Sequence, residues 1–95
     1  MQAYTQAQVE AALGQETVAG WQRDEASGEI FKQYQFENFV QALEFVNRVG
    51  AIAEELGHHP DITINYNRVK LSVITHDAGG LTELDFKLAA RANQS

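Results

Sequence analysis

The sequence predicts an α+β fold in the order αββαββα, with a four-stranded antiparallel sheet and three helices packed on one face. Residues 39–56 carry apolar side chains at spacings of three and four, the period of an α-helix. The segments 21–36 and 61–76 alternate between apolar and polar residues on either side of a turn, as hairpins do. Two hairpins, with helices before, between and after them, favour an antiparallel sheet covered by helices.

The first helix is expected at residues 6–13. Thr5 and Gln8 have the spacing of a capping box, in which each side chain bonds the other residue's backbone N–H. Val9 and Leu13 follow at helical spacing, and Gly14 suits the end of the helix.

The first hairpin is expected to join a short strand at 21–24 to a longer one at 29–36, through a turn at 26–28. The longer strand alternates, with Ile30 and Tyr34 on one face and Gln33 and Gln35 on the other. Aromatic residues in such a pattern favour a strand.

The long helix has recognisable signals at both ends. Asn38 is expected to cap it, with Gln41 three residues later, and Gly57 fits the left-handed position that ends many helices. The apolar positions between them run for five turns; they are Phe39, Leu43, Val46, Val49, Ile52, Ala53 and Leu56.

The second hairpin is expected to have strands at 61–66 and 69–76, with a turn at Asn67 and Arg68. His76 would end the fourth strand, and residues 77–80 would form a loop. Thr82 would then cap a last helix at 83–93.

Composition limits the classes of function. The chain has 95 residues, which is the size of one domain, here 1–95. A net charge of −6 with dispersed Lys and Arg argues against direct binding to nucleic acid or an anionic membrane. No cysteine is present, which excludes disulfides and thiolate catalysis. We see no secretion signal and no membrane-spanning run, so a cytoplasmic location is the expectation.

The three histidines of the chain are His58, His59 and His76. Histidine is the side chain that exchanges protons most readily near neutral pH. An antiparallel hairpin returns the end of its second strand to the start of its first, which would place His76 beside Asp61. The three imidazoles are therefore expected to converge at one end of the sheet.

The neighbours of these histidines allow two interpretations each. Pro60 favours an extended His59, so the side chains of the adjacent pair should diverge. Glu54, four residues before His58, is either a solvated acid or the partner of an imidazolium. Asp85, three residues after Thr82, is either a capping-box acid or a carboxylate at the rim of the site.

Converging histidines suggest two chemistries. Three imidazoles could bind zinc and leave a fourth position for water, although no His-x-x-x-His spacing supports this. Alternatively, they could act as general acid and base on an uncharged organic substrate. No Gly-x-Ser-x-Gly turn and no phosphate-binding loop are present, so neither a serine nucleophile nor nucleotide binding is indicated.

These residues and their spacing resemble the signature of the pterin-4a-carbinolamine dehydratase family. The matching elements cover roughly residues 20–90; they are Gly20-Trp21, Ile30-Phe31-Lys32-Gln33, Glu54-x-x-x-His58-His59-Pro60, Tyr66, His76, Ala78-Gly79-Gly80-Leu81 and Asp85. The family's fold, an antiparallel four-stranded sheet with three helices, agrees with the order deduced above.

The resemblance implies a dehydratase that removes water from 4a-hydroxytetrahydropterin to give quinonoid dihydropterin, in the recycling of tetrahydrobiopterin. It implies no metal and no redox cofactor. His58, His59 and His76 carry over as the active-site histidines. His58 and His76 are expected to transfer protons, while His59 binds and orients the pterin.

The resemblance also implies a set of residues around the substrate. Glu54 would tune His58, and Pro60 would shape the wall of the site. The residues flanking His76 would contact the pterin; they are Thr75, Asp77 and Ala78. Ile62 departs from the family pattern, which often has an aromatic residue two positions after the proline, and this change would alter the packing beside the pterin.

The same resemblance leaves a second class of function open. Some animal relatives serve as dimerisation cofactors of a homeodomain transcription factor, and some bacterial relatives with degenerate sites assist Rubisco assembly. The complete histidine set favours catalysis here. The implied partners are a small pterin substrate and further copies of the chain, as a homodimer or homotetramer, with a functional link to an aromatic amino acid hydroxylase.

Overall fold

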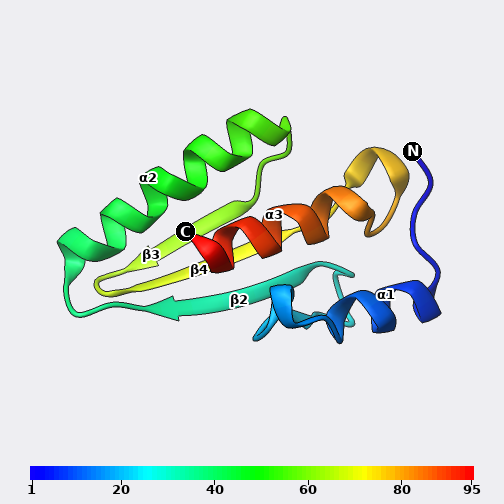
Figure 1. Cartoon of the computed structure of the whole chain (residues 1–95), viewed down its shortest axis with the longest axis horizontal. Helices are drawn as coiled ribbons and strands as arrows, with labels where there is room; N and C mark the ends of the chain where they lie inside the picture. The colour runs from blue at the N-terminus through cyan, green and yellow to red at the C-terminus, as the bar shows by residue number, and fades with distance from the viewer.

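The computed structural model describes all residues, 1–95, and combines three α-helices with one four-stranded antiparallel sheet (Figure 1). The helices are α1 (Gln6–Leu13), α2 (Phe39–Leu56) and α3 (Glu83–Gln94), with 3₁₀ turns η1 (Glu16–Val18) and η2 (His76–Ala78). The strands are β1 (Gln22–Arg23), β2 (Ile30–Gln35), β3 (Asp61–Asn65) and β4 (Arg68–Val73), in the spatial order β1-β2-β4-β3. The predicted α+β class and αββαββα order are confirmed.

The predicted ends of α1 and α2 are confirmed because their signals are local, whereas α3 ends at residue 94, one residue later than predicted. Thr5 and Gln8 form the reciprocal capping box of α1, and Asn38 accepts a hydrogen bond from the backbone N–H of Gln41 at the start of α2. Gly57 ends α2 with a φ of 64°, in the left-handed region that glycine tolerates best. None of the helices is both long and apolar enough to cross a membrane.

The core lies between the helices and one face of the sheet. Along β4, Val69, Leu71 and Val73 are buried, whereas Lys70 between them is exposed. Phe45 of α2 belongs to the same buried cluster. Figure 1 shows α2 and α3 running along the sheet. This one-sided burial follows from the period of two along a strand.

The second hairpin turns one residue earlier than predicted. Ile64 pairs with Val69 and Asn65 pairs with Arg68, so the turn consists of Tyr66 and Asn67. Tyr66 leaves the strand with a φ of 52°, which is uncommon for a residue other than glycine. The register is set by pairing apolar residues on the helix-covered face, and that pairing takes precedence over the expected turn dipeptide.

The predicted fourth strand was too long. β4 ends at Val73, and the chain bends so that Thr75 makes an isolated bridge to Gly80. His76 therefore begins η2 and does not end a strand. The first strand is also shorter than expected, because only Gln22 and Arg23 pair with β2.

The apolar stripe of α2 is wider than the surface it covers. Val49, Ile52 and Ala53 are buried as expected. Phe39 and Leu43, which belong to the same predicted stripe, remain 44% and 38% exposed. Part of the helix therefore presents apolar side chains to the outside of the chain.

A polar cluster ties the end of α3 to β2 and to the segment after η1. The side-chain oxygen of Asn93 accepts hydrogen bonds from Tyr34 Oη at 2.5 Å, Lys32 Nζ at 2.8 Å and Trp21 Nε1 at 3.3 Å. Its amide nitrogen donates to the backbone carbonyls of Thr17 and Ala19. One side chain thus satisfies polar groups from several segments, which buried groups require.

Burial in this cluster raises the pKa of Tyr34 to about 12. A tyrosine in an unfolded chain ionises near pH 10. Between about pH 10 and 12 the unfolded chain has lost this proton while the folded chain keeps it, so the free energy of unfolding should fall as pH rises. Urea unfolding across this window should show the fall in the wild type and a smaller slope in Tyr34→Phe.

Burial lowers the pKa of Lys32, which acts with the opposite sign and at lower pH. Comparing the wild type with Tyr34→Phe largely removes that contribution, because both proteins keep Lys32. Identical slopes in the two proteins would contradict the assignment to Tyr34.

Candidate active site

The three histidines line one open hollow of about 230 Å³ at the end of the sheet. Its remaining lining residues are Ile74, Thr75 and Asp77. The hairpin thus brings together imidazoles that are separated by seventeen residues between His59 and His76. An adjoining hollow of about 110 Å³ shares His59, Ile74 and His76 and extends to Asp61.

His58 is placed by the end of α2. The backbone N–H of His58 donates to the carbonyl of Ala53, and that of Gly57 donates to Glu54. These two bonds are the Schellman arrangement, which needs the left-handed Gly57 between them. The chain is therefore turned out of the helix at a fixed angle, directing His58 toward the start of α3.

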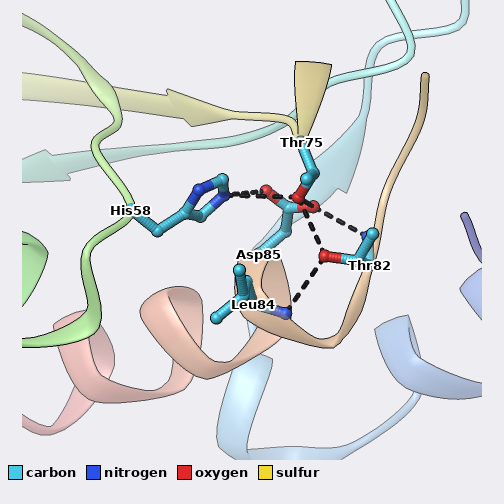
Figure 2. Close-up of polar contacts among 5 residues, drawn as sticks. All are labelled: His58, Thr75, Thr82, Leu84 and Asp85. Carbon is cyan, nitrogen blue, oxygen red and sulfur yellow. Dashed lines mark hydrogen bonds and ion pairs between the residues drawn. The ribbon is translucent and has the colours of Figure 1, made fainter. Parts of the chain in front are cut away.

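His58 pairs with a buried carboxylate. Its Nε2 lies 2.6 Å from Oδ1 of Asp85, whose side chain is fully buried, while the His58 side chain is 12% exposed. The other carboxylate oxygen of Asp85 accepts from the hydroxyl of Thr75 and the backbone N–H of Thr82, both at 2.8 Å (Figure 2). A buried charge persists only when it is paired and hydrogen-bonded in this way.

His59 points to a different acid. Its Nε2 lies 2.5 Å from Oε2 of Glu54, and the two side chains are 61% and 78% exposed. The expectation that Glu54 would tune His58 was wrong, because Pro60 draws the chain into an extended path on which the two rings diverge. Solvent screens the Glu54–His59 pair, so it orients the ring more than it stabilises the fold.

His76 is an exposed member of the arrangement. It stands at the start of η2, where both His76 and Asp77 are exposed. Thr75, immediately before them, is only 8% exposed. Of these three neighbours, His76 and Asp77 are free to meet a ligand, whereas Thr75 is committed to contacts within the chain.

Several predicted site residues do not line the hollow. Pro60 and Ala78 lie beside lining residues, Glu54 stands behind His59, and Asp85 lies beneath His58 and not at the rim. Two contributors were missed from the site, Ile74 in the lining and Thr82 in the network around Asp85. The Thr82–Asp85 capping-box spacing was the available signal, since it places that carboxylate against the chain.

The arrangement can move protons. Two imidazoles are held by carboxylates and a third is exposed, all around one hollow. No group of three or more His, Cys, Asp or Glu side chains is arranged to hold a metal ion. Another hollow, about 240 Å³ between α1 and α3, contains only Glu83 and Lys87 as charged residues, and these already form an ion pair. Of these two hollows, the one lined by the histidines is the one whose side chains can exchange protons near neutral pH.

Comparison with known proteins identifies a family that matches almost the whole chain. A family model described as pterin 4 alpha carbinolamine dehydratase matches residues 2–95. The chain is 49% identical over 92 residues to a Gloeobacter violaceus protein named "Putative pterin-4-alpha-carbinolamine dehydratase 2", covering 95% of this chain and 98% of that one. A Thermomicrobium roseum protein with the same name, without the number, is 52% identical over 81 residues, covering 85% and 84% of the two chains.

Solved structures share the fold. The structure described as a transcriptional coactivator/pterin dehydratase from Brucella melitensis superposes with a TM-score of 0.91 at 33% identity, covering 98% of this chain and 97% of that one. A pterin dehydratase-like protein described as a RuBisCO assembly factor in the alpha-carboxysome has a TM-score of 0.68 at 24% identity, covering 83% and 92%. The second likeness concerns the fold alone.

The fold and the site together define this protein as an α+β domain with a histidine-lined hollow. Within that class, this chain belongs to the pterin-4a-carbinolamine dehydratase family. The resemblance seen in the motif residues is confirmed.

Replacing Asp85 by Asn should destabilise the fold. The amide keeps the size of the side chain but loses the charge and one acceptor oxygen, so Thr75, Thr82 or His58 loses a good partner. The loss of a buried acceptor costs about 1–3 kcal/mol in the free energy of unfolding, measurable by urea denaturation. Glu83→Gln is the matched control, because Glu83 is an exposed acid in the same helical turn. Equal effects of the two changes would contradict the role of Asp85.

Proposed function

We propose that this protein catalyses the dehydration of 4a-hydroxytetrahydropterin to quinonoid dihydropterin, as a hydro-lyase in tetrahydrobiopterin recycling. The observation that carries the proposal is the meeting of His58, His59 and His76 around one hollow, with carboxylates holding two of the rings. Membership of the family supports the same reaction. The proposal extends to a functional link with an aromatic amino acid hydroxylase, whose product would be the substrate.

The reaction needs an acid and a base on one small molecule. The acid donates a proton to the 4a-hydroxyl as the C4a–O bond breaks, so that oxygen leaves as water. The base takes the proton from N5, and that electron pair forms the C4a–N5 double bond. Imidazoles serve both steps near neutral pH without a metal or redox cofactor.

The surroundings of each histidine suggest its role. His58 and His76 transfer the protons, since one is held against Asp85 and the other stands exposed across the hollow. His59, oriented by Glu54, binds and orients the pterin. Asp77 lines the hollow and contacts the substrate from η2, while Pro60 and Ala78 shape the adjoining backbone.

The activity is tested by following absorbance as freshly generated 4a-hydroxytetrahydropterin loses water. The wild type should exceed the spontaneous rate, and His58→Ala and His76→Ala should each lower the enzymatic rate by roughly 10²- to 10⁴-fold, the usual contribution of a general acid or base. Gln33→Ala is the control, because Gln33 is exposed on the uncovered face of the sheet. A wild-type rate equal to that in buffer would reject the enzyme and favour a binding or assembly role on this fold.

We also propose that the chain self-associates through an apolar surface on α2, β3 and the turn that follows β3. Apart from Met1, every exposed large hydrophobic residue belongs to this surface; they are Phe39, Val40, Leu43, Ile62, Ile64 and Tyr66. β3 is an edge strand that pairs only with β4, so its outer backbone groups are free to pair with another β3. A two-fold arrangement of two copies would cover this edge and its apolar neighbours.

A charge within this surface should separate the subunits. Val40 is 62% exposed, so Val40→Glu should leave the monomer folded while placing an unpaired charge at the interface. Sedimentation should give a dimer or tetramer for the wild type and a smaller species for the variant. Gln33→Glu adds the same charge to the opposite face and should leave the mass unchanged. A monomeric wild type would reject the proposal.

A further inference from the structure

The donors and acceptors around an ionised Asp85 can be assigned one after another from its contacts. An ionised carboxylate can only accept, so the Thr75 hydroxyl that lies 2.8 Å from Oδ2 must donate its proton there. Thr75 Oγ1 also lies 2.8 Å from the hydroxyl of Thr82. Because Thr75 has already used its only proton, Thr82 must be the donor in this second bond.

The series ends at the backbone of α3. Thr82 Oγ1, having donated to Thr75, accepts from the N–H of Leu84 at 3.2 Å. The direction of each bond is therefore fixed from Leu84 through Thr82 and Thr75 to Asp85 (Figure 2). We call Thr82, Thr75 and Asp85 the hydroxyl relay.

The relay determines which ring nitrogen of His58 carries the hydrogen. Oδ1 of Asp85 accepts from Nε2 of His58 at 2.6 Å, so Nε2 carries a hydrogen. In the neutral ring, Nδ1 is then the nitrogen with a free lone pair. The hydrogen bonds of the His58 ring within the chain all involve Nε2, so Nδ1 has no partner within the chain, and His58 lines the hollow.

The relay also changes the assignment of Thr75. Its position beside His76 implied contact with the pterin, yet its side chain is 8% exposed and its proton is directed at Asp85. The hydroxyl stands 3.5 Å from Nε2 of His58, too far for a strong bond, so Thr75 acts on the ring mainly through Asp85.

We propose that Asp85, held by the hydroxyls of Thr75 and Thr82, fixes His58 as the Nε2–H tautomer and leaves Nδ1 to exchange the proton with the substrate. Thr75 is then a positioning residue and not a pterin contact. The tautomer is a property of the folded chain alone, whereas the role of Nδ1 rests on the proposed dehydratase function.

The tautomer is read by ¹⁵N NMR of the histidine side chains, at a pH where the His58 ring is neutral. The protonated and free ring nitrogens have well separated shifts, so the spectrum of the wild type should show Nε2–H for His58. The exposed His59 and His76 serve as internal comparisons. Asp85→Asn should give a mixture of tautomers, because an amide can present either a donor or an acceptor. A wild-type His58 in the Nδ1–H form would overturn the proposal whether or not the protein is a dehydratase.

The role of Thr75 is tested with a matched pair of variants. Thr75→Val keeps the shape and removes the hydroxyl, so the carboxylate is held less firmly; the His58 Nε2–H signal should broaden and kcat should fall roughly tenfold, with KM within about twofold. Thr75→Ser restores the hydroxyl and should restore the signal and kcat. A raised KM with unchanged kcat, or an unchanged Nε2–H signal in Thr75→Val, would overturn the positioning role. If Thr75→Val does not fold, failure of Thr75→Ser to give the wild-type signal and kcat would overturn it equally.

Discussion

The buried carboxylate of Asp85 is the point on which both the fold and the site depend. It caps the first turn of α3 through Thr82, it bonds Thr75 beyond the end of β4, and it holds the ring of His58 beyond the end of α2. Segments from three parts of the chain thus meet at two oxygen atoms. Removing a charge from water is costly, and here three donors offset that cost. The carboxylate of Asp85, which accepts hydrogen bonds from three donors, therefore holds together the segments around the hollow.

The adjacent histidines share a chemistry but not an environment. His58 sits against a buried acid, whereas His59 and its partner Glu54 are mostly exposed. The left-handed Gly57 and the proline after His59 produce this difference, because they turn the chain twice within four residues. One mostly buried and one mostly exposed imidazole thereby line the same hollow. A rigid proton donor or acceptor favours precise geometry, and an adaptable ring suits the admission and release of a ligand.

The sequence was sufficient where structure is local. The bounds of α2 follow from Asn38, the apolar period and Gly57, and the convergence of the histidines follows from the antiparallel hairpin. The sequence was insufficient where a contact joins residues that are far apart in the chain or where one carboxylate has two neighbouring histidines to choose from. His58 and Asp85 are 27 residues apart, so nothing in their spacing reveals that they touch. Glu54 is four residues from His58 and five from His59, so spacing alone favours the histidine that it does not contact. The turn at Tyr66 and the end of β4 depended on strand register, which only the assembled sheet defines.

Asp85 both caps α3 and bonds His58, and this combination affects how such a site can be lost during evolution. His59 and His76 are exposed, so replacing either should change the free energy of unfolding little. Replacing His58 leaves a buried negative charge with one donor fewer, which calls for a compensating change at residue 85. Relatives that keep this fold after abandoning catalysis should therefore have discarded His59 or His76 first, and should vary at residues 58 and 85 together.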